Sequence, residues 1–440
     1  MMDAKELGLV FFPAFDWAIN PVHPEREERL LYTRDQIVEE GLLDMPSIQE
    51  YKPNVATYRD IERVHICVPD IKSLITDAHL VSAGGVIAAA DAVMRGEVKR
   101  AFALTRPPGH HAMRVVHGTR GFCVINNEAI MVEYLRKKYG IRKVAIVDTD
   151  VHHGDGTQDV FYNDPDTLFI SFHQDGRTLY PGTGFTDELG SPRAFGTTMN
   201  LPLPPGTTDA GLHQVLDHLI MPVLAEFKPD IIINSAGQDN HYSDPLANMN
   251  ITAQGYARLA DKLKADIAVL EGGYSIETAL PYVNVGIILA MAGMDYSKVI
   301  EPDIDKCPSE SLGVTRAIHS LIKEQQGMWA QREKLTREAV VQAGDFWQRT
   351  RNIYYDEDGI NEQQIERVHL CPKCASYSTI ATEASGSGFG RKSAFAALIS
   401  REACTSCQQA AVDAVHKGKK IGKYQHYFVQ NKKEDTLEKM

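Results

Sequence analysis

The sequence predicts an α/β fold in which a central, mostly parallel sheet carries helices on both faces, followed by a small C-terminal module with four cysteines. Short apolar segments rich in β-branched residues alternate with longer segments of helical spacing, a pattern typical of parallel strands joined by helices. Polar side chains gather where the apolar segments end, and open α/β sheets bind their ligands there. Two Cys-x-x-Cys sequences near the C-terminus form a separate pattern.

The expected elements follow along the chain. A helix is expected at 23–43, after a proline-containing entry. Buried strands are expected at 98–104, 143–150, 167–173, 230–237 and 266–273. Amphipathic helices are expected at 127–140, 210–227 and 252–265, and one or two polar helices at 309–348. We therefore divide the chain into a large catalytic domain at 1–300, a helical connector at 301–365 and a cysteine-containing module with a basic tail at 366–440.

Length and composition narrow the class of protein. The 440 residues are many for one core, while 43% hydrophobic and 24% charged residues are ordinary for a globular protein. A formal net charge of -12 argues against nucleic acid as the main partner, and the basic run at 416–424 is expected to be a solvated tail. No apolar run reaches the roughly 18 residues of a membrane helix, and no signal peptide is apparent. We expect a cytoplasmic protein without a membrane partner, leaving a nuclear location open for a eukaryotic source, and a homo-oligomer open as well.

A candidate metal site lies in the sequence DTDVHHGDG. Asp148, Asp150 and His152 are spaced two residues apart, so in an extended chain they share one face and can address one ion together. Asp239, which follows another predicted strand, is a further candidate ligand. Two aspartates and one histidine around Zn²⁺ would leave one coordination position open, as catalytic zinc sites do. The alternative is that these aspartates cap a helix or bind loop amides.

Candidate acid–base groups lie in two loops. His110 and His111 stand in RPPGHHA, and adjacent imidazoles suit acid–base catalysis because they titrate near neutral pH. Asp148 and Asp155 are the carboxylates available to orient them. Two histidines in a polar turn are the alternative. Tyr274 follows two glycines in LEGGYS, where its hydroxyl could donate to a developing oxyanion, although a packed tyrosine is the commoner case.

Several motifs occur together in a fixed order from about residue 20 to 295. They are HPEREERL, RPPGHHA, GFCVINN, DTDVHHGDGTQDVFY, SFHQ, YPGTG, GQDNHYSDP and LEGGY. In this order they resemble the zinc-dependent histone deacetylase family, which includes acetylpolyamine amidohydrolases and bacterial deacetylase-like amidohydrolases. RPPGHHA and LEGGY look more like the class II branch. The resemblance implies the arginase/deacetylase fold.

The resemblance also implies a role for each matching polar residue. The catalytic zinc would be held by Asp150, His152 and Asp239. The tandem histidines would be His110 and His111, backed by Asp148 and Asp155, and Tyr274 would polarise the scissile carbonyl. A structural monovalent cation, usually K⁺, would be held by Asp148, Asp150, His152, Ser171 and Phe172.

A narrow tunnel for the acyl-lysine stem is implied as well. Its substrate-binding residues would be Gly121, Phe122, Tyr180, Leu246 and Gly273, and Arg29 would lie at its inner end. Tyr180 stands where phenylalanine is usual, and Leu246 stands where polyamine-selective relatives carry an acidic residue. His241 is expected near the rim of the tunnel. The segment between the catalytic histidines and the tunnel carries three more side chains that would help to select the substrate: Arg114, His117 and Arg120.

Together these features predict a deacetylase that hydrolyses the amide of N-acetyl-lysine, or of another N-acyl-lysine, in proteins or peptides. Zinc-activated water would attack the carbonyl with help from the histidine pair, and His111 would protonate the leaving amine. Leu246 favours acyl-lysine over polyamine. One alternative is a deacylase of acetylpolyamines or another small acylated amine. The other is a noncatalytic acyl-lysine binding scaffold, against which the intact ligands, histidines and Tyr274 speak.

The four C-terminal cysteines predict a second zinc site. Cys371 and Cys374 form one Cys-x-x-Cys pair, and Cys404 and Cys407 form the other. Two such pairs in a reduced compartment suit a closed, tetrahedral structural zinc. Two unrelated pairs or a redox dithiol are the alternatives. The module could act as a stabilising clip, a dimer contact or a substrate-recruiting element.

Overall fold

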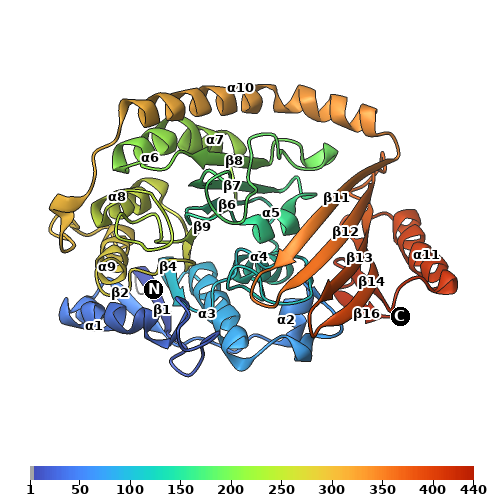
Figure 1. Cartoon of the computed structure of the whole chain (residues 1–440), viewed down its shortest axis with the longest axis horizontal. Coiled ribbons are helices and arrows are strands. Elements are labelled where there is room, and N and C mark those ends of the chain that lie inside the picture. The colour runs from blue at the N-terminus through green and yellow to red at the C-terminus, as the bar shows by residue number, and fades with distance from the viewer. Residues whose placement is uncertain (1–3) are drawn as a thin grey trace.

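Eight parallel strands form the central sheet of the protein. In the computed structural model, which describes residues 4–440, they are ordered β2-β1-β4-β10-β9-β6-β7-β8 (Figure 1). The strands are β1 (Lys5–Phe12), β2 (Ile48–Tyr51), β4 (Val98–Thr105), β6 (Val144–Asp148), β7 (Thr167–Gln174), β8 (Thr198–Leu203), β9 (Ile231–Ala236) and β10 (Ile267–Leu270). Every neighbouring pair is parallel. The α/β class is confirmed, and the five predicted strands correspond to β4, β6, β7, β9 and β10.

Helices cover both faces of this sheet and form two apolar cores with it. The helices are α1 (Leu31–Glu39), α2 (Tyr58–Glu62), α3 (Asp77–Met94), α4 (Asn127–Tyr139), α5 (Asp155–Phe161), α6 (Asp209–Val215), α7 (Met221–Phe227), α8 (Ala253–Leu263) and α9 (Leu280–Met291). One core joins the sheet to α1 and α6–α9, and the other joins it to α2–α5. Helices α6 and α7 are continuous through a π-helical turn at Leu216–Ile220, so the predicted helix at 210–227 is present. The N-terminal helix is shorter than predicted.

Helix α3 is long and apolar enough to cross a membrane, with a mean hydropathy of 1.2 over 18 residues. In the fold, 72% of this segment is buried, and the helix packs against β1 and β4. The sequence reading overlooked it because alanine and glycine, which fill much of 83–92, give little helical periodicity.

Helix α10 (Leu312–Ala343) runs along one edge of the central domain towards the C-terminal sheet (Figure 1). Only one stripe of it is buried, including Ile318, Ile322 and Trp329. The Trp329 indole donates a 2.7 Å hydrogen bond to Glu226 of α7. Most of the remaining side chains of the helix are polar, in line with the predicted polar helix, although Leu312 and Val341 are exposed apolar residues.

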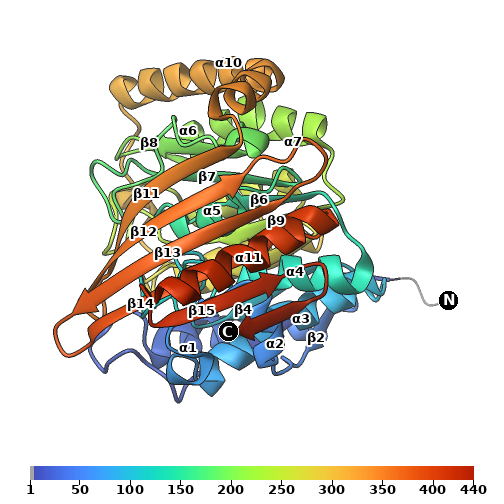
Figure 2. The same ribbon diagram turned by 90° about the vertical axis from the view of Figure 1, so that its right-hand side faces the viewer.

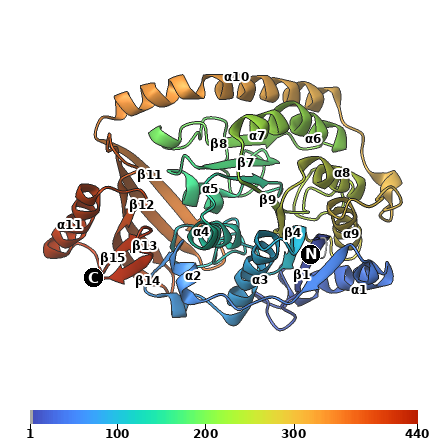
Figure 3. The same cartoon turned by 180° about the vertical axis from the view of Figure 1, so that it is seen from behind.

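A second, six-stranded sheet follows α10 and packs against the side of the central domain (Figures 1 and 3). Its strands are β11 (Phe346–Tyr355), β12 (Ile360–His369), β13 (Tyr377–Gly386), β14 (Gly390–Ile399), β15 (His426–Asn431) and β16 (Thr436–Lys439). Helix α11 (Thr405–Ile421) connects the parallel strands β14 and β15 and lies across the outer face of the sheet (Figure 2). On the inner side, the sheet packs against the short strands β3 (Ile66–Cys67) and β5 (Val115–Val116).

Two expectations for this part of the chain differ from the structure. The connector at 301–365 is not all helical, because β11 and the start of β12 lie inside it. The inward positions of β12 include Glu362, Gln364 and Glu366, so the strand lacks the apolar alternation by which a strand is usually recognised. The basic run at 416–424 is not a free tail either, since it forms the end of α11 and leads into β15.

Candidate active site

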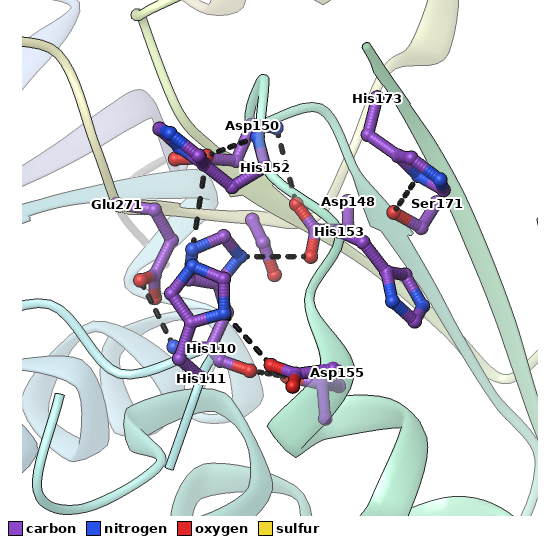
Figure 4. A network of polar contacts seen from close by, with 12 residues as sticks. His110, His111, Asp148, Asp150, His152, His153, Asp155, Ser171, His173 and Glu271 are labelled. Atoms are coloured by element: carbon purple, nitrogen blue, oxygen red, sulfur yellow. Dashed lines mark hydrogen bonds and ion pairs between the residues drawn. The ribbon is translucent and has the colours of Figure 1, made fainter. Parts of the chain in front are cut away.

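The polar residues at the strand ends converge on one edge of the central sheet, as the sequence predicts. Asp148 is the last residue of β6, and Asp239 and Glu271 follow β9 and β10. The loop after β4 carries His110 and His111 over the same edge (Figure 4). Because neighbouring parallel strands end at the same edge of a sheet, segments far apart in the sequence supply one site.

Asp150, His152 and Asp239 form a cluster suited to a metal ion. One ligand atom of each lies within 4.8 Å of the others. His152 Nδ1 is 3.1 Å from Asp150 Oδ1 and 3.1 Å from Asp239 Oδ2. Gly272 makes this approach possible, because a Cβ atom there would lie 2.1 Å from Asp239 Oδ2. Two carboxylates and one imidazole with a free side facing a cavity fit a catalytic divalent ion such as zinc.

His110 and His111 lie side by side, with ring centroids 4.1 Å apart. The Nδ1 atom of His110 is 3.1 Å from Asp148 Oδ2, and that of His111 is 2.8 Å from Asp155 Oδ1. All four side chains are buried. The two carboxylates predicted to orient the histidines are therefore in contact with them, and each fixes a proton on Nδ1 so that Nε2 is the nitrogen left for chemistry.

Arg120 contacts the second of these pairs and was not predicted to do so. Its Nε donates a 3.1 Å hydrogen bond to Asp155 Oδ2, opposite the oxygen that His111 contacts. Burial opposes a charge on Asp155, but Arg120 outweighs this effect and holds the pKa of the carboxyl below its usual range.

The two histidines differ in pKa. At His111, burial and the neighbouring His110 lower the pKa to about 3. At His110, burial is outweighed by carboxylates, Asp150 first, and the pKa is raised. The two imidazoles are thus held at different basicities.

Glu271 fixes the loop that carries the histidines. Its Oε2 accepts hydrogen bonds from the backbone N–H groups of Gly109 at 2.8 Å and His110 at 3.0 Å. Burial and the neighbouring Glu128 raise the pKa of Glu271 well above its usual value. Glu271 was not among the predicted site residues, because nothing local to it in the sequence indicates its contacts with Gly109 and His110.

Tyr274 is held between a buried arginine and a buried aspartate. The Arg29 guanidinium lies 5.0 Å from the centre of its ring, donates to Gly273 O at 2.8 Å and pairs with Glu25. Asp244 accepts the Tyr274 backbone N–H at 2.7 Å, a contact that the sequence reading missed. Burial raises the pKa of Tyr274 well above its usual value, so the phenol stays protonated and can donate.

A cavity of about 270 Å³ opens onto these groups. Its lining includes the predicted tunnel residues Gly121, Phe122, Tyr180 and Leu246, together with the histidines, Asp150, His152 and Tyr274. The Tyr180 ring lies 5.2 Å from the His111 ring, and the Phe122 ring lies 5.4 Å from the Tyr274 ring. Gly121 (φ 50°) allows this closeness, because a Cβ atom would lie 2.4 Å from His111 Cδ2. Gly273 adjoins the cavity beside Tyr274 but is not among its lining residues.

Comparisons with known proteins bear on this geometry. Residues 70–285 match the model of the histone deacetylase domain. A probable deacetylase of Archaeoglobus fulgidus is 47% identical over 311 residues, which cover 64% of this chain and 85% of that one. The chain belongs to the histone deacetylase family. It is thus an amidohydrolase of the deacetylase type, and the family implies a metal ion, typically zinc.

Two further comparisons, one with a protein sequence and one with a solved structure, support this assignment. An acetylpolyamine amidohydrolase of Burkholderia pseudomallei is 40% identical over 202 residues, which cover 45% of this chain and 58% of that one. A crystal structure of the HDA15 HD domain superimposes with a TM-score of 0.65 at 26% identity, over 77% of this chain and 99% of that one. This likeness confirms the predicted deacetylase fold of the central sheet.

The residues expected to hold a monovalent cation lie close together in this deacetylase-family chain. Asp148 and Ser171 are paired in register on β6 and β7, and Phe172 is the next residue of β7. The Ser171 hydroxyl lies 2.9 Å from His173 Nδ1 (Figure 4). The potassium ion itself stays a prediction.

The four side chains expected to help select the substrate are not among the lining residues of the cavity. His241 is buried and contacts Glu301 at 3.2 Å. Arg114 donates to Asp159 O at 2.9 Å, and His117 contacts Thr382 of β13 at 3.0 Å. These side chains, like that of Arg120, bind other residues of the protein. Arg114, His117 and Arg120 contact the C-terminal sheet. The sequence could not indicate this, because the sheet itself was not predicted.

The four cysteines of the C-terminal module meet at one point. Their Sγ atoms lie within 4.8 Å of one another. Cys371 and Cys374 belong to the loop after β12, and Cys404 and Cys407 lie at the start of α11. The cluster thereby ties α11 to the far end of the β11–β12 hairpin. Four convergent thiols in two pairs fit a tetrahedral zinc ion.

Proposed function

We propose that this protein hydrolyses the amide of N-acetyl-lysine, or of another N-acyl-lysine, in proteins or peptides. The observation that carries the proposal is the cavity in which two aromatic walls, Phe122 and Tyr180, lead to the histidine pair, Tyr274 and the candidate metal ligands. A narrow aromatic passage suits an extended alkyl stem, and the groups at its end suit an amide. Leu246 in the lining supports an apolar stem.

We propose that Asp150, His152 and Asp239 hold Zn²⁺. When bound, this ion would polarise the amide carbonyl and lower the pKa of a water molecule in the cavity. The Tyr274 phenol, kept protonated by burial, donates a hydrogen bond to the oxygen on which negative charge develops. Arg29 beneath the ring holds Tyr274 in place.

The histidine pair moves the protons. With Nδ1 directed at Asp148 and Asp155, each ring turns Nε2 towards the reacting atoms. The pair accepts a proton from the attacking water, and His111 passes a proton to the amine as the carbon–nitrogen bond breaks. Amide and water thus become carboxylate and free amine, which is acetate and lysine for an acetylated substrate.

Replacing Tyr274→Phe tests the proposal. The ring packing remains while the donor is lost, so kcat should fall about 10²–10³-fold with bound zinc unchanged. Tyr58→Phe, on the exposed surface of α2, is the matched control and should keep full activity. Activity on acetyl-lysine peptides that is unaffected by Tyr274→Phe would overturn the proposed mechanism.

A small acylated amine is the second candidate substrate. It is favoured by one observation, the carboxylate of Asp356 in the lining of the cavity. The relative named acetylpolyamine amidohydrolase agrees with such a substrate. We further propose that the four cysteines hold a structural zinc ion, and that Asp148, Ser171 and Phe172 hold K⁺ together with the zinc-site residues Asp150 and His152.

A further inference from the structure

The turn between β11 and β12 brings the C-terminal sheet to the mouth of the catalytic cavity. It contains three consecutive acidic residues, Asp356, Glu357 and Asp358. Only Asp356 lines the cavity. The turn therefore contributes a charged side chain to a passage whose aromatic and aliphatic walls come from the central domain.

Asp356 is held in place by one of its two oxygens. Oδ1 accepts hydrogen bonds from the Gly121 backbone N–H and from the Tyr180 hydroxyl, each at 3.0 Å. Within residues 4–440, Oδ2 has no hydrogen-bond partner, and it is not enclosed. Both contacts of Oδ1 are with residues that line the cavity, so the carboxylate is fixed at the lining and keeps one oxygen available.

The charges around Asp356 leave its carboxylate uncompensated. Arg120 is the nearby cation, with its guanidinium 5.5 Å from the Tyr180 ring. It is already paired with Asp155 and donates to Tyr354 O. The two residues that follow Asp356 in the turn are also acidic. The mouth of the cavity thus carries net negative charge, in a half-buried setting where solvent screens it incompletely.

The other two carboxylates serve to dock the turn. Glu357 contacts His23 Nε2 at 3.2 Å, and the His23 ring packs 4.3 Å from Phe122. Asp358 accepts the Thr119 backbone N–H at 2.6 Å. Because these contacts lie on the central domain and outside the cavity lining, Asp358 offers a control for the charge of the turn without a contact to substrate.

We propose that Asp356 is a specificity-determining residue that selects acylated amines carrying a positively charged group besides the neutral amide. The free oxygen would bind an ammonium or guanidinium group of the substrate while the acyl amide lies at Tyr274. This rests on the proposed function, since it assigns the outer end of the same cavity. The cation belongs either to a small N-acylated diamine or to a basic residue next to an acyl-lysine, and one chemistry recognises both.

The test uses Asp356→Asn in the full-length, zinc-loaded protein. Asparagine keeps the oxygen that accepts from Gly121 and Tyr180 but removes the charge. Four substrates form two matched pairs: a mono-N-acetylated diamine against an N-alkylacetamide of equal length, and an acetyl-lysine peptide with flanking arginine against one with flanking alanine. We expect kcat/KM to fall about tenfold for the cationic member of one pair, mainly through KM, and less than about twofold for its neutral partner. The pair that responds identifies the source of the cation.

Controls and a binding measurement keep the outcomes distinct. Asp358→Asn should leave both preferences unchanged. The binding measurement uses two alkyl hydroxamates that differ only in a terminal ammonium or methyl group. The wild type should bind the ammonium compound more tightly, and Asp356→Asn should bind the two compounds equally. Equal affinities in the wild type, or an equal loss for charged and neutral substrates, would overturn the role of Asp356. Absent hydrolysis with the ammonium preference intact would contradict the proposed reaction and support the charge selection.

Discussion

The central sheet and the C-terminal sheet bury different kinds of side chain. All residues of strand β6 are buried. They are apolar except Asp148, which is the last residue of the strand. Strand β12 alternates, and its buried positions include Glu362, Gln364 and Glu366. The central sheet thus confines polar groups to its catalytic edge, whereas the C-terminal sheet buries polar groups of β12 beside the apolar residues with which it docks on the central domain. Stability and catalysis should therefore respond differently to changes in the two regions.

Loss of the cysteine cluster should have the largest effect and should be confined to the C-terminal sheet. Cys371→Ser removes one of four thiolates from a site whose metal would supply about 10 kcal/mol or more of folding free energy. We expect the bound zinc to drop by one ion per chain and the C-terminal sheet to become susceptible to proteolysis. Metal analysis and limited proteolysis measure both. Cys307→Ser, at a cysteine outside the cluster, is the control. A chain that keeps all its zinc after Cys371→Ser would contradict the structural site.

Loss of a catalytic metal ligand should affect the central domain and leave the C-terminal sheet intact. Asp150→Asn should lower activity at least about 10³-fold and remove the other zinc ion, because the carboxylate is one of only three protein ligands. The C-terminal sheet should keep its zinc and its resistance to protease. If proteolysis of the sheet followed the loss of the catalytic ion, the two metal sites would have to be treated as one cooperative unit.

The buried ion pairs between the regions should give the next largest effect. Arg349 of β11 contacts Asp159 at 2.8 Å and Glu366 at 2.7 Å. Arg349→Ala would leave two buried carboxylates short of a partner, which costs about 3–5 kcal/mol. Chemical denaturation measures this cost. Arg391→Ala, at an exposed pair with Glu383, should cost less than about 1 kcal/mol. Equal losses for the two variants would show that the interface is held by its apolar contacts.

The same contrast explains what the sequence could predict. In the central domain, apolar strands and polar strand ends are local signals, so β4, β6, β7, β9 and β10 and the residues of the metal cluster were located. Contacts between segments far apart were not located. Asp148 and Asp155 were expected to orient the histidine pair, but the contact of Arg120 with the other oxygen of Asp155 was not predicted.

The C-terminal sheet was missed for a physical reason. A strand whose inner face binds arginines and histidines of another domain has no apolar alternation, and a pattern built on hydrophobicity reads it as a polar connector. Asp356 was missed with it, since nothing in the sequence shows that a turn about 80 residues after Tyr274 reaches the cavity. The cysteines were located because metal-ligand spacing does not depend on the surrounding fold.

Acidification should give the smallest effect, and it should act first on the central domain. His65 is buried; its Nδ1 donates to Met113 O, and its Nε2 accepts from the Asn126 backbone N–H, both at 2.9 Å. Burial lowers its pKa to about 4, against about 6.5 in the unfolded chain. Between these values the unfolded state binds the extra proton, so stability falls as the pH drops from 6.5 towards 4, by at most about 3 kcal/mol.

His65→Gln sharpens this last comparison, because glutamine can donate and accept but does not titrate in this range. Denaturation curves for the wild type and the variant between pH 4.5 and 7.5 should diverge in slope below pH 6.5, with the wild type losing stability faster. Effects of acid on the metal ligands are common to both proteins and cancel in the difference. Parallel pH profiles would mean that His65 is protonated in the folded state as readily as in the unfolded chain, and that acid sensitivity resides elsewhere in the molecule.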